Sequence, residues 1–254
     1  MPVLEAPLVA ALCAVALLGG LFLAWRLSPP GRALGLAVVA CCGCAFGVIT
    51  GDVLAQERLA GADGPLADWL TANRSEGLTA VMQVTTNLGS AWAALPLALV
   101  AAVIVPAPEH RRRAAVTALV AVAGIIALVN AIKLVVGRAR PDLALVLVET
   151  DSASFPSGHA AQSAAACAAI AHLVAAHRPE RALRITAWPV AAAVVLVVGY
   201  SRLYLGAHWL TDVLGGYALG TAWTAAVITA LHRPPRVTAA RFGAPAPEGR
   251  AGPL

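Results

Sequence analysis

Long apolar runs, separated by short polar or basic segments, dominate the chain. A helix needs about 20 apolar residues to cross a bilayer, and runs of about that length recur along the sequence. They cover residues 7–25, 33–54, 90–106, 114–136, 158–176, 185–201 and 209–231. The pattern predicts an all-α, polytopic bundle of transmembrane helices, in which the run at 7–25 is one additional N-terminal helix before six others.

The segment between the second and third runs, residues 55–89, is more polar. It includes a short amphipathic stretch around Leu66, Trp69 and Leu70, which predicts an extracytoplasmic loop with a helix lying in the membrane interface. Such a helix could guide a lipid toward a site or simply pack on the surface. Asp52, at the outer end of the second run, is interpreted as an interfacial cap rather than a catalytic group.

Composition supports a membrane protein. The 254 residues are 59% hydrophobic and 12% charged, with a mean hydropathy of +0.78, and a soluble domain of this size is far less apolar. All the cysteines lie inside apolar runs, where a buried Cys usually acts as a small hydrophobic residue rather than a metal ligand or disulfide partner. These are Cys13, Cys41, Cys42, Cys44 and Cys167.

The positive charges follow the predicted topology. Of the 18 Lys and Arg residues, most fall on one side of the predicted spans, which the positive-inside rule makes cytoplasmic. The exceptions are Arg58, Arg74, Lys133, Arg138, Arg140 and Arg202. Topology therefore explains the net charge of +5 without a nucleic-acid partner. The predicted units are a retained helix and basic turn at 1–32, a membrane domain at 33–232 and a disordered cytoplasmic tail at 233–254.

Three stretches carry candidate chemistry, and the predicted topology brings them to the extracytoplasmic face. In the stretch 200–212, His208 and Asp212 are spaced i and i+4, so on a helix they would share a face. Lys133 and Arg140 are seven apart, two turns of a helix that Pro141 should stop. The sequence PSGH at 156–159 precedes an Ala-rich run and predicts a helix N-terminus, which favours a phosphate.

Together these stretches resemble a known family. The order K-x6-RP at 133–141, PSGH at 156–159 and SR-x5-H-x3-D at 201–212 is similar to the type 2 phosphatidic acid phosphatase superfamily of integral-membrane lipid phosphatases. The resemblance covers roughly residues 33–232, with no departure at any motif position. It implies a six-helix core and metal-independent hydrolysis of a lipid phosphate or pyrophosphate within the bilayer, with no cofactor.

The resemblance also implies a role for each motif residue. His208 would be the nucleophile that forms a phosphohistidine, oriented by Asp212, and His159 would protonate the leaving group and then activate water. The phosphoryl oxygens would be held by Lys133, Arg140, Ser157, Gly158 and Arg202. Arg138 stays open between phosphate binding and an ion pair with Asp142 or Asp151.

Other functions are less compatible with the sequence. Vanadium-dependent haloperoxidases share a similar scaffold, but they are soluble and this chain is not. A transporter or lipid-binding protein could use the same cationic pocket without catalysis, yet it would not need both His159 and His208. Undecaprenyl pyrophosphate, phosphatidylglycerol phosphate and phosphatidic acid stay open as substrates.

Overall fold

The computed structural model describes residues 30–56, 59–103, 105, 108–141, 146–148 and 152–231. The predicted helix at 7–25 and the predicted tail at 233–254 lie outside these residues. Within them the chain forms helices and no strand. The helices are α2 (Pro30–Ala55), η1 (Ala60–Ala62), α3 (Asp63–Ala72), α4 (Glu76–Thr86), η2 (Asn87–Gly89), α5 (Ala91–Val103), α6 (Pro108–Val136), α7 (Gly158–His177), α8 (Arg181–Tyr204) and α9 (Leu210–Leu231).

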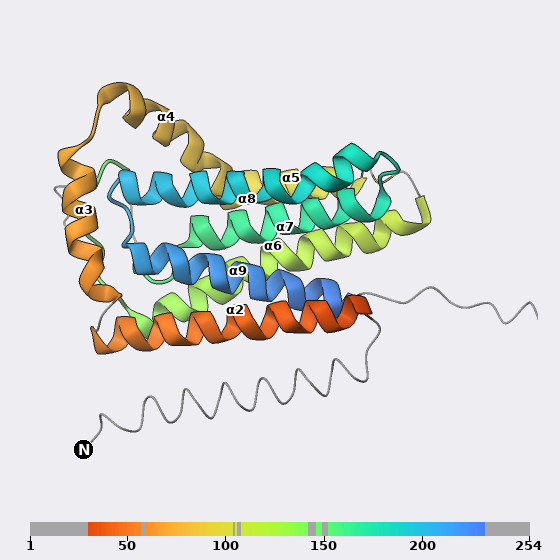
Figure 1. Ribbon diagram of the computed structural model, residues 1–254, viewed down its shortest axis with the longest axis horizontal. Coiled ribbons are helices and arrows are strands. Elements are labelled where there is room, and N and C mark those ends of the chain that lie inside the picture. Colours follow the sequence, from red (N-terminus) through yellow and green to blue (C-terminus); the bar gives the residue numbers. More distant parts are fainter. Residues whose placement is uncertain are drawn as a thin grey trace, which may run out of the picture.

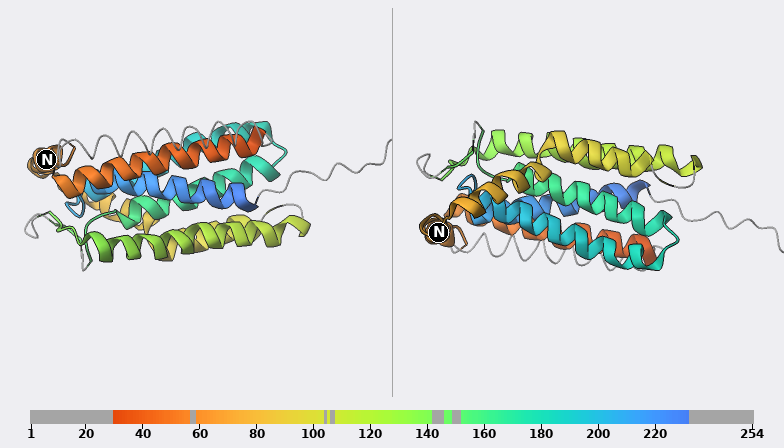
Figure 2. Two further views of the ribbon diagram at one scale, coloured as in Figure 1. Left: turned by 90° about the horizontal axis from the view of Figure 1, so that it is seen from below. Right: turned by 90° about the horizontal axis from the view of Figure 1, so that it is seen from above.

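The long helices run lengthwise beside one another, and α3 crosses one end of the bundle (Figure 1). The lengthwise helices are α2, α5, α6, α7, α8 and α9. Helix α7 packs against α5, α6, α8 and α9, while α2 lies along α9, as the two side views also show (Figure 2). Among the described residues, α2, α6, α7, α8 and α9 are each long and apolar enough to cross a membrane. The predicted all-α transmembrane bundle is thus confirmed.

The third predicted span, at 90–106, is helical over Ala91–Val103 (α5), but this helix is too short to cross a membrane alone. Helix α5 has only 13 residues, about 20 Å at 1.5 Å per residue, which is too short for a hydrocarbon core of about 30 Å. Only together are Glu76–Gly89 and Ala91–Val103 long and apolar enough to cross a membrane, and the two segments are bent by 57° relative to each other. The predicted loop therefore includes a second helix, α4, whose start is capped by the Ser75 side chain accepting from Leu78 N.

The predicted amphipathic helix is confirmed as α3. Its Leu70 is buried, whereas Trp69 is 60% exposed. Asp52 is confirmed as a cap just before this helix, since its carboxylate accepts hydrogen bonds from Leu59 N at 3.3 Å and Ala60 N at 2.7 Å.

Small residues let α7 and α9 approach closely, as is common between membrane helices. A Cβ added to Gly216 would lie 2.6 Å from Ser157 O and 2.9 Å from Ala160 Cβ. The same contact is fixed by Ser157 N, which donates to Asp212 O at 2.9 Å. The start of α7 is thereby fixed against the first turns of α9.

We therefore expect Gly216→Ala to destabilise the protein by about 1–3 kcal/mol, because overpacking forces the backbone of α7 away from α9. Thermal unfolding in detergent measures this as a lower Tm. Gly43→Ala is the matched control, since a Cβ at Gly43 meets no atom within 4 Å. Equal Tm values for the two variants would contradict this account of the contact.

Candidate active site

The predicted site residues converge at the end of the bundle that α3 crosses (Figure 1). Lys133 lies in the last turn of α6, Arg202 in the last turn of α8, and Asp212 in the first turn of α9. His159 lies in the first turn of α7, and His208 in the connection between α8 and α9. Four helix ends thus supply one cluster of polar side chains.

Helix α6 ends where the predicted span at 114–136 ends, and not at Pro141 as the motif spacing suggested. It stops at Val136, and Gly137 adopts the left-handed conformation with φ of 59°, which is a common way to end a helix. Lys133 and Arg140 are therefore not two turns apart on one helix, as the spacing suggested. Arg140 lies on the segment after α6, and the turn at Gly137 directs that segment back toward the cluster.

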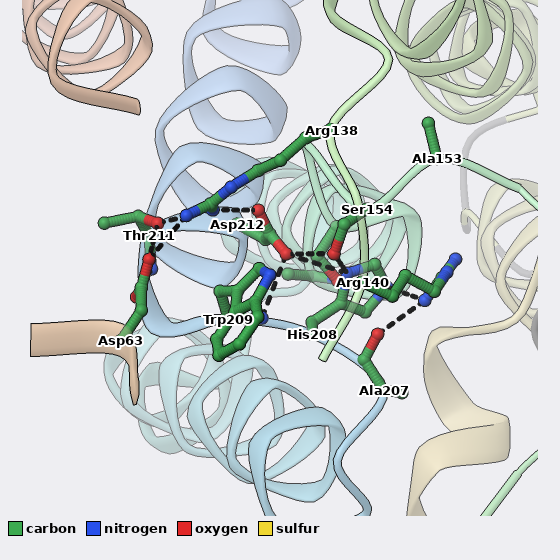
Figure 3. Close-up of polar contacts among 12 residues, drawn as sticks. Asp63, Arg138, Arg140, Ala153, Ser154, Ala207, His208, Trp209, Thr211 and Asp212 are labelled. Atoms are coloured by element: carbon green, nitrogen blue, oxygen red, sulfur yellow. Dashed lines mark hydrogen bonds and ion pairs between the residues drawn. The ribbon is translucent and has the colours of Figure 1, made fainter. Parts of the chain in front are cut away.

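The pairing of His208 with Asp212 is confirmed, although α9 begins only after His208. The two atoms His208 Nδ1 and Asp212 Oδ2 lie 3.4 Å apart. Asp212 is fully buried, and the same Oδ2 accepts hydrogen bonds from Trp209 N at 2.9 Å and from Ser154 Oγ. Figure 3 shows these groups around the carboxylate. The arrangement fixes the Nδ1 side of the imidazole and leaves Nε2 as the ring nitrogen that does not face the carboxylate.

Burial lowers the pKa of His208 to about 4. The Asp212 carboxylate opposes this shift, while Arg202 and Arg140 lower the pKa further. The ordinary imidazole value is 6.5. The ring is therefore neutral at pH 7, the state in which Nε2 can act as a nucleophile.

This low pKa predicts the acidic pH at which kcat/KM begins to fall. His208 should lose its lone pair only as the pH falls through about 4, so kcat/KM should persist down to about pH 5. The measurement is kcat/KM against pH, corrected for ionisation of the substrate's own phosphate. A fall in kcat/KM near pH 6.5 that is due to the enzyme, and not to the substrate, would contradict the low pKa.

Two cations of the first motif hold the turn at 152–153. Lys133 Nζ donates to Ala153 O at 2.6 Å and to Ser152 Oγ at 3.1 Å. Arg140 donates through Nε to Ser152 O at 2.7 Å and through one NH group to Ala207 O at 2.5 Å. The same NH group lies 3.4 Å from His208 Nε2. The positive charge of Arg140 thus lies next to His208 Nε2.

Arg202 is the most deeply buried cation of the cluster. It is 4% exposed and donates one NH group to Thr86 Oγ1 at 2.9 Å. Its Nε is buried and has no hydrogen-bond partner among the described residues. A buried donor on a charged group that has no hydrogen-bond partner lowers the stability of the fold. Because Arg202 Nε also lies beside the other cations, it indicates that an anionic ligand binds here.

The PSGH segment forms the predicted helix N-terminus. Ser157 is the N-cap of α7, and its buried Oγ accepts from Ala160 N at 3.5 Å. Gly158 is the first helical residue, and a Cβ there would make ordinary contacts, the nearest at 3.6 Å. His159 is within electrostatic range of Arg202, His208, Lys133 and Arg140. The two histidines therefore belong to one cluster.

Arg138 binds carboxylates. Its two NH groups lie 2.5 Å from Asp212 Oδ1 and 2.7 Å from Asp63 Oδ2, as Figure 3 shows. The predicted partners Asp142 and Asp151 lie outside the described residues. Sequence reasoning missed Asp63, because a single Asp in a polar segment between glycines gives no signal of such a contact.

The side chains of the cluster favour binding of an anion over binding of a metal cation. Within the described ranges, no group of three His, Cys, Asp or Glu side chains is placed to hold a metal ion. Lys133, Arg140 and Arg202 would also repel a cation. The described cysteines, Cys41, Cys42, Cys44 and Cys167, are free thiols, and Cys13 lies outside the described residues. The described part of the chain thus offers a cluster of cations beside two histidines.

Known proteins resemble this chain in sequence and in fold. A sequence profile described as the PAP2 superfamily matches residues 114–236. Phosphatidylglycerophosphatase B of Bacillus subtilis (strain 168) is 33% identical over 179 residues, which span 69% of this chain and 86% of that protein. The crystal structure of the first transmembrane PAP2 type phosphatidylglycerolphosphate phosphatase from Bacillus subtilis aligns with a TM-score of 0.66 and 28% identity. That alignment covers 74% of this chain and 93% of that one.

Proposed function

The chain belongs to the PAP2 superfamily and is a lipid phosphatase of the membrane, and from this premise we propose that it acts without a metal through a phosphohistidine. His208 Nε2 attacks the phosphorus, and the bond from phosphorus to the lipid oxygen breaks. Asp212 accepts the hydrogen bond of Nδ1–H and stabilises the positive charge that the ring gains. His159 donates the proton that the departing lipid alkoxide needs.

The second step regenerates the enzyme. Water attacks the phosphohistidine and loses a proton to His159, and the bond from phosphorus to Nε2 breaks to release inorganic phosphate. His159 returns to its protonated form and His208 to its neutral form. The proton balance over both steps is that of hydrolysis.

The single observation that carries this proposal is the buried, unpartnered Nε of Arg202. A phosphoryl oxygen accepting from this atom would satisfy it, and the contact is strongest when negative charge develops in the transition state. Lys133, Arg140 and the N-terminus of α7 at Ser157 and Gly158 would hold the remaining oxygens.

The substrate proposed first is phosphatidylglycerol phosphate. The similar sequence and the similar structure from Bacillus subtilis are both named as phosphatases of this lipid, and its terminal phosphate is a monoester with a lipid alkoxide as the leaving group. Undecaprenyl pyrophosphate and phosphatidic acid present the same dianionic end group, so they are the competing substrates.

The site is proposed to face the extracytoplasmic side. Among the described cations outside the cluster, Arg74 and Arg138 lie near the site, and the others lie at or beside helix ends at the opposite end of the bundle (Figure 1), which the positive-inside rule makes cytoplasmic. They are Arg32, Arg111, Arg112, Arg113, Arg178, Arg181 and Arg184.

Phosphate release by the purified protein in detergent tests the proposal. The three lipids are compared at equal surface concentration, with and without EDTA. We expect release that is unchanged by EDTA and fastest for phosphatidylglycerol phosphate. Loss of activity with EDTA, restored by a divalent metal, would refute the metal-free mechanism. A preference for another lipid would overturn only the substrate assignment.

A further inference from the structure

Asp63, the first residue of α3, reaches the first turn of α9. Its Oδ1 accepts from Thr211 N at 3.0 Å, and its Oδ2 accepts from Thr211 Oγ1 at 2.6 Å. Asp63 is 4% exposed and Thr211 is fully buried. A carboxylate from a helix that crosses the bundle end is therefore buried against the residue next to Asp212.

These contacts complete the N-terminal cap of α9. Asp212, the third residue of the helix, accepts from Trp209 N at 2.9 Å, which is one half of a capping box. The other half requires a side-chain oxygen that accepts from the second or third helical N–H. Trp209, at the N-cap position, has no such oxygen. Asp63 supplies it from α3 by accepting from Thr211 N.

Arg138 closes the network from the other side. One NH group donates to both Thr211 Oγ1, at 2.7 Å, and Asp212 Oδ1, at 2.5 Å, while the other donates to Asp63. Its guanidinium carbon also lies 5.8 Å from the centroid of the Trp209 ring. The Asp212 carboxylate is thus held by Arg138 through Oδ1, which leaves Oδ2 directed at His208.

The net charge of the group explains why Asp63 is needed in addition to Asp212. Without Asp63, Arg138 would be paired with Asp212 alone, and a bound arginine draws carboxylate charge away from the imidazole. With Asp63 present, the guanidinium bridges two carboxylates and the Asp63–Arg138–Asp212 group keeps one net negative charge. That charge is available to stabilise the imidazolium character of His208.

We propose that Asp63 and Arg138 are positioning residues that orient and charge Asp212 for its action on His208, so that catalysis depends on α3 being docked on α9. This inference rests on the proposed role of His208. Neither residue contacts the phosphoryl group. Their removal should lower kcat and leave phosphate binding by Lys133, Arg140 and Arg202 intact.

The test compares Asp63→Ala with Asp68→Asn, an exposed position on the same helix. We expect Asp63→Ala to lower kcat by about 10- to 100-fold, which is the usual effect of removing a group that orients a functional side chain. KM and the inhibition constant of inorganic phosphate should change by no more than about two-fold. Asp63→Asn keeps an acceptor for Thr211 N but no charge for Arg138. Its kcat should therefore lie between that of Asp63→Ala and that of the wild type.

A double-mutant cycle separates positioning from general loss of structure. Once Asp212→Asn has removed the carboxylate that Asp63 acts upon, Asp63→Ala should lower kcat little further. Fully additive losses, or a kcat for Asp63→Ala equal to that of Asp68→Asn, would overturn the inference. Normal activity of His208→Asn would instead overturn the proposed function, so the two failures are distinguishable.

Discussion

His208→Asn should abolish turnover, with a loss of roughly 10⁴-fold or more in kcat, as expected when a covalent nucleophile is removed. Asn keeps an N–H group that can donate to Asp212, so the buried carboxylate stays partnered, but it offers no ring nitrogen to the phosphorus. The variant should also form no phosphoenzyme. The measurement combines phosphate release with trapping of labelled enzyme.

The control for this variant is His110→Asn, an exposed histidine at the opposite end of the bundle. It should retain wild-type activity and form the phosphoenzyme normally. If His208→Asn kept more than about one hundredth of wild-type kcat while folded, His208 could not be the nucleophile.

His159→Ala should show the second largest effect, because it removes the acid of the first step and the base of the second. General acid–base catalysis contributes about 10²- to 10⁴-fold, so kcat on a lipid phosphate should fall by that range. The leaving-group chemistry gives a sharper signature. Nitrophenolate departs without a proton, so p-nitrophenyl phosphate should still phosphorylate His208 in this variant.

The phosphoenzyme of His159→Ala should then accumulate, because its hydrolysis still lacks the base. A burst of nitrophenolate followed by slow steady turnover is the expected trace. Equal losses of the first step on both substrates would contradict the role of His159 as the acid.

The long apolar runs predicted most of the described helices correctly, and the motifs predicted residues that lie together at one end of the bundle. Five described helices match predicted spans, since about 20 apolar residues in a row leave few alternatives to a membrane helix. The pairing of His208 with Asp212 followed from their spacing, and the N-terminus at Ser157 followed from the change from polar to Ala-rich sequence.

Two features that the sequence did not predict depend on tertiary contacts. Helix α4 joins α5 at a bend of 57°, and Gly89 lies at that bend with a Cβ position only 2.8 Å from His159 O. The stop at Pro141 was wrong for a local reason, because Gly137 ends α6 in the left-handed conformation. Asp63 and its partner Arg138 are 75 residues apart in the chain, a separation that no local pattern reports.

Identification of the phosphorylated residue tests the central claim most directly. Wild-type protein and His159→Ala are mixed with labelled p-nitrophenyl phosphate in EDTA, quenched in alkali, which preserves phosphohistidine, and digested for mass spectrometry. We predict phosphate on His208, with more label in His159→Ala than in the wild type. Phosphate on another residue, or no label while turnover proceeds in EDTA, would contradict the phosphohistidine mechanism.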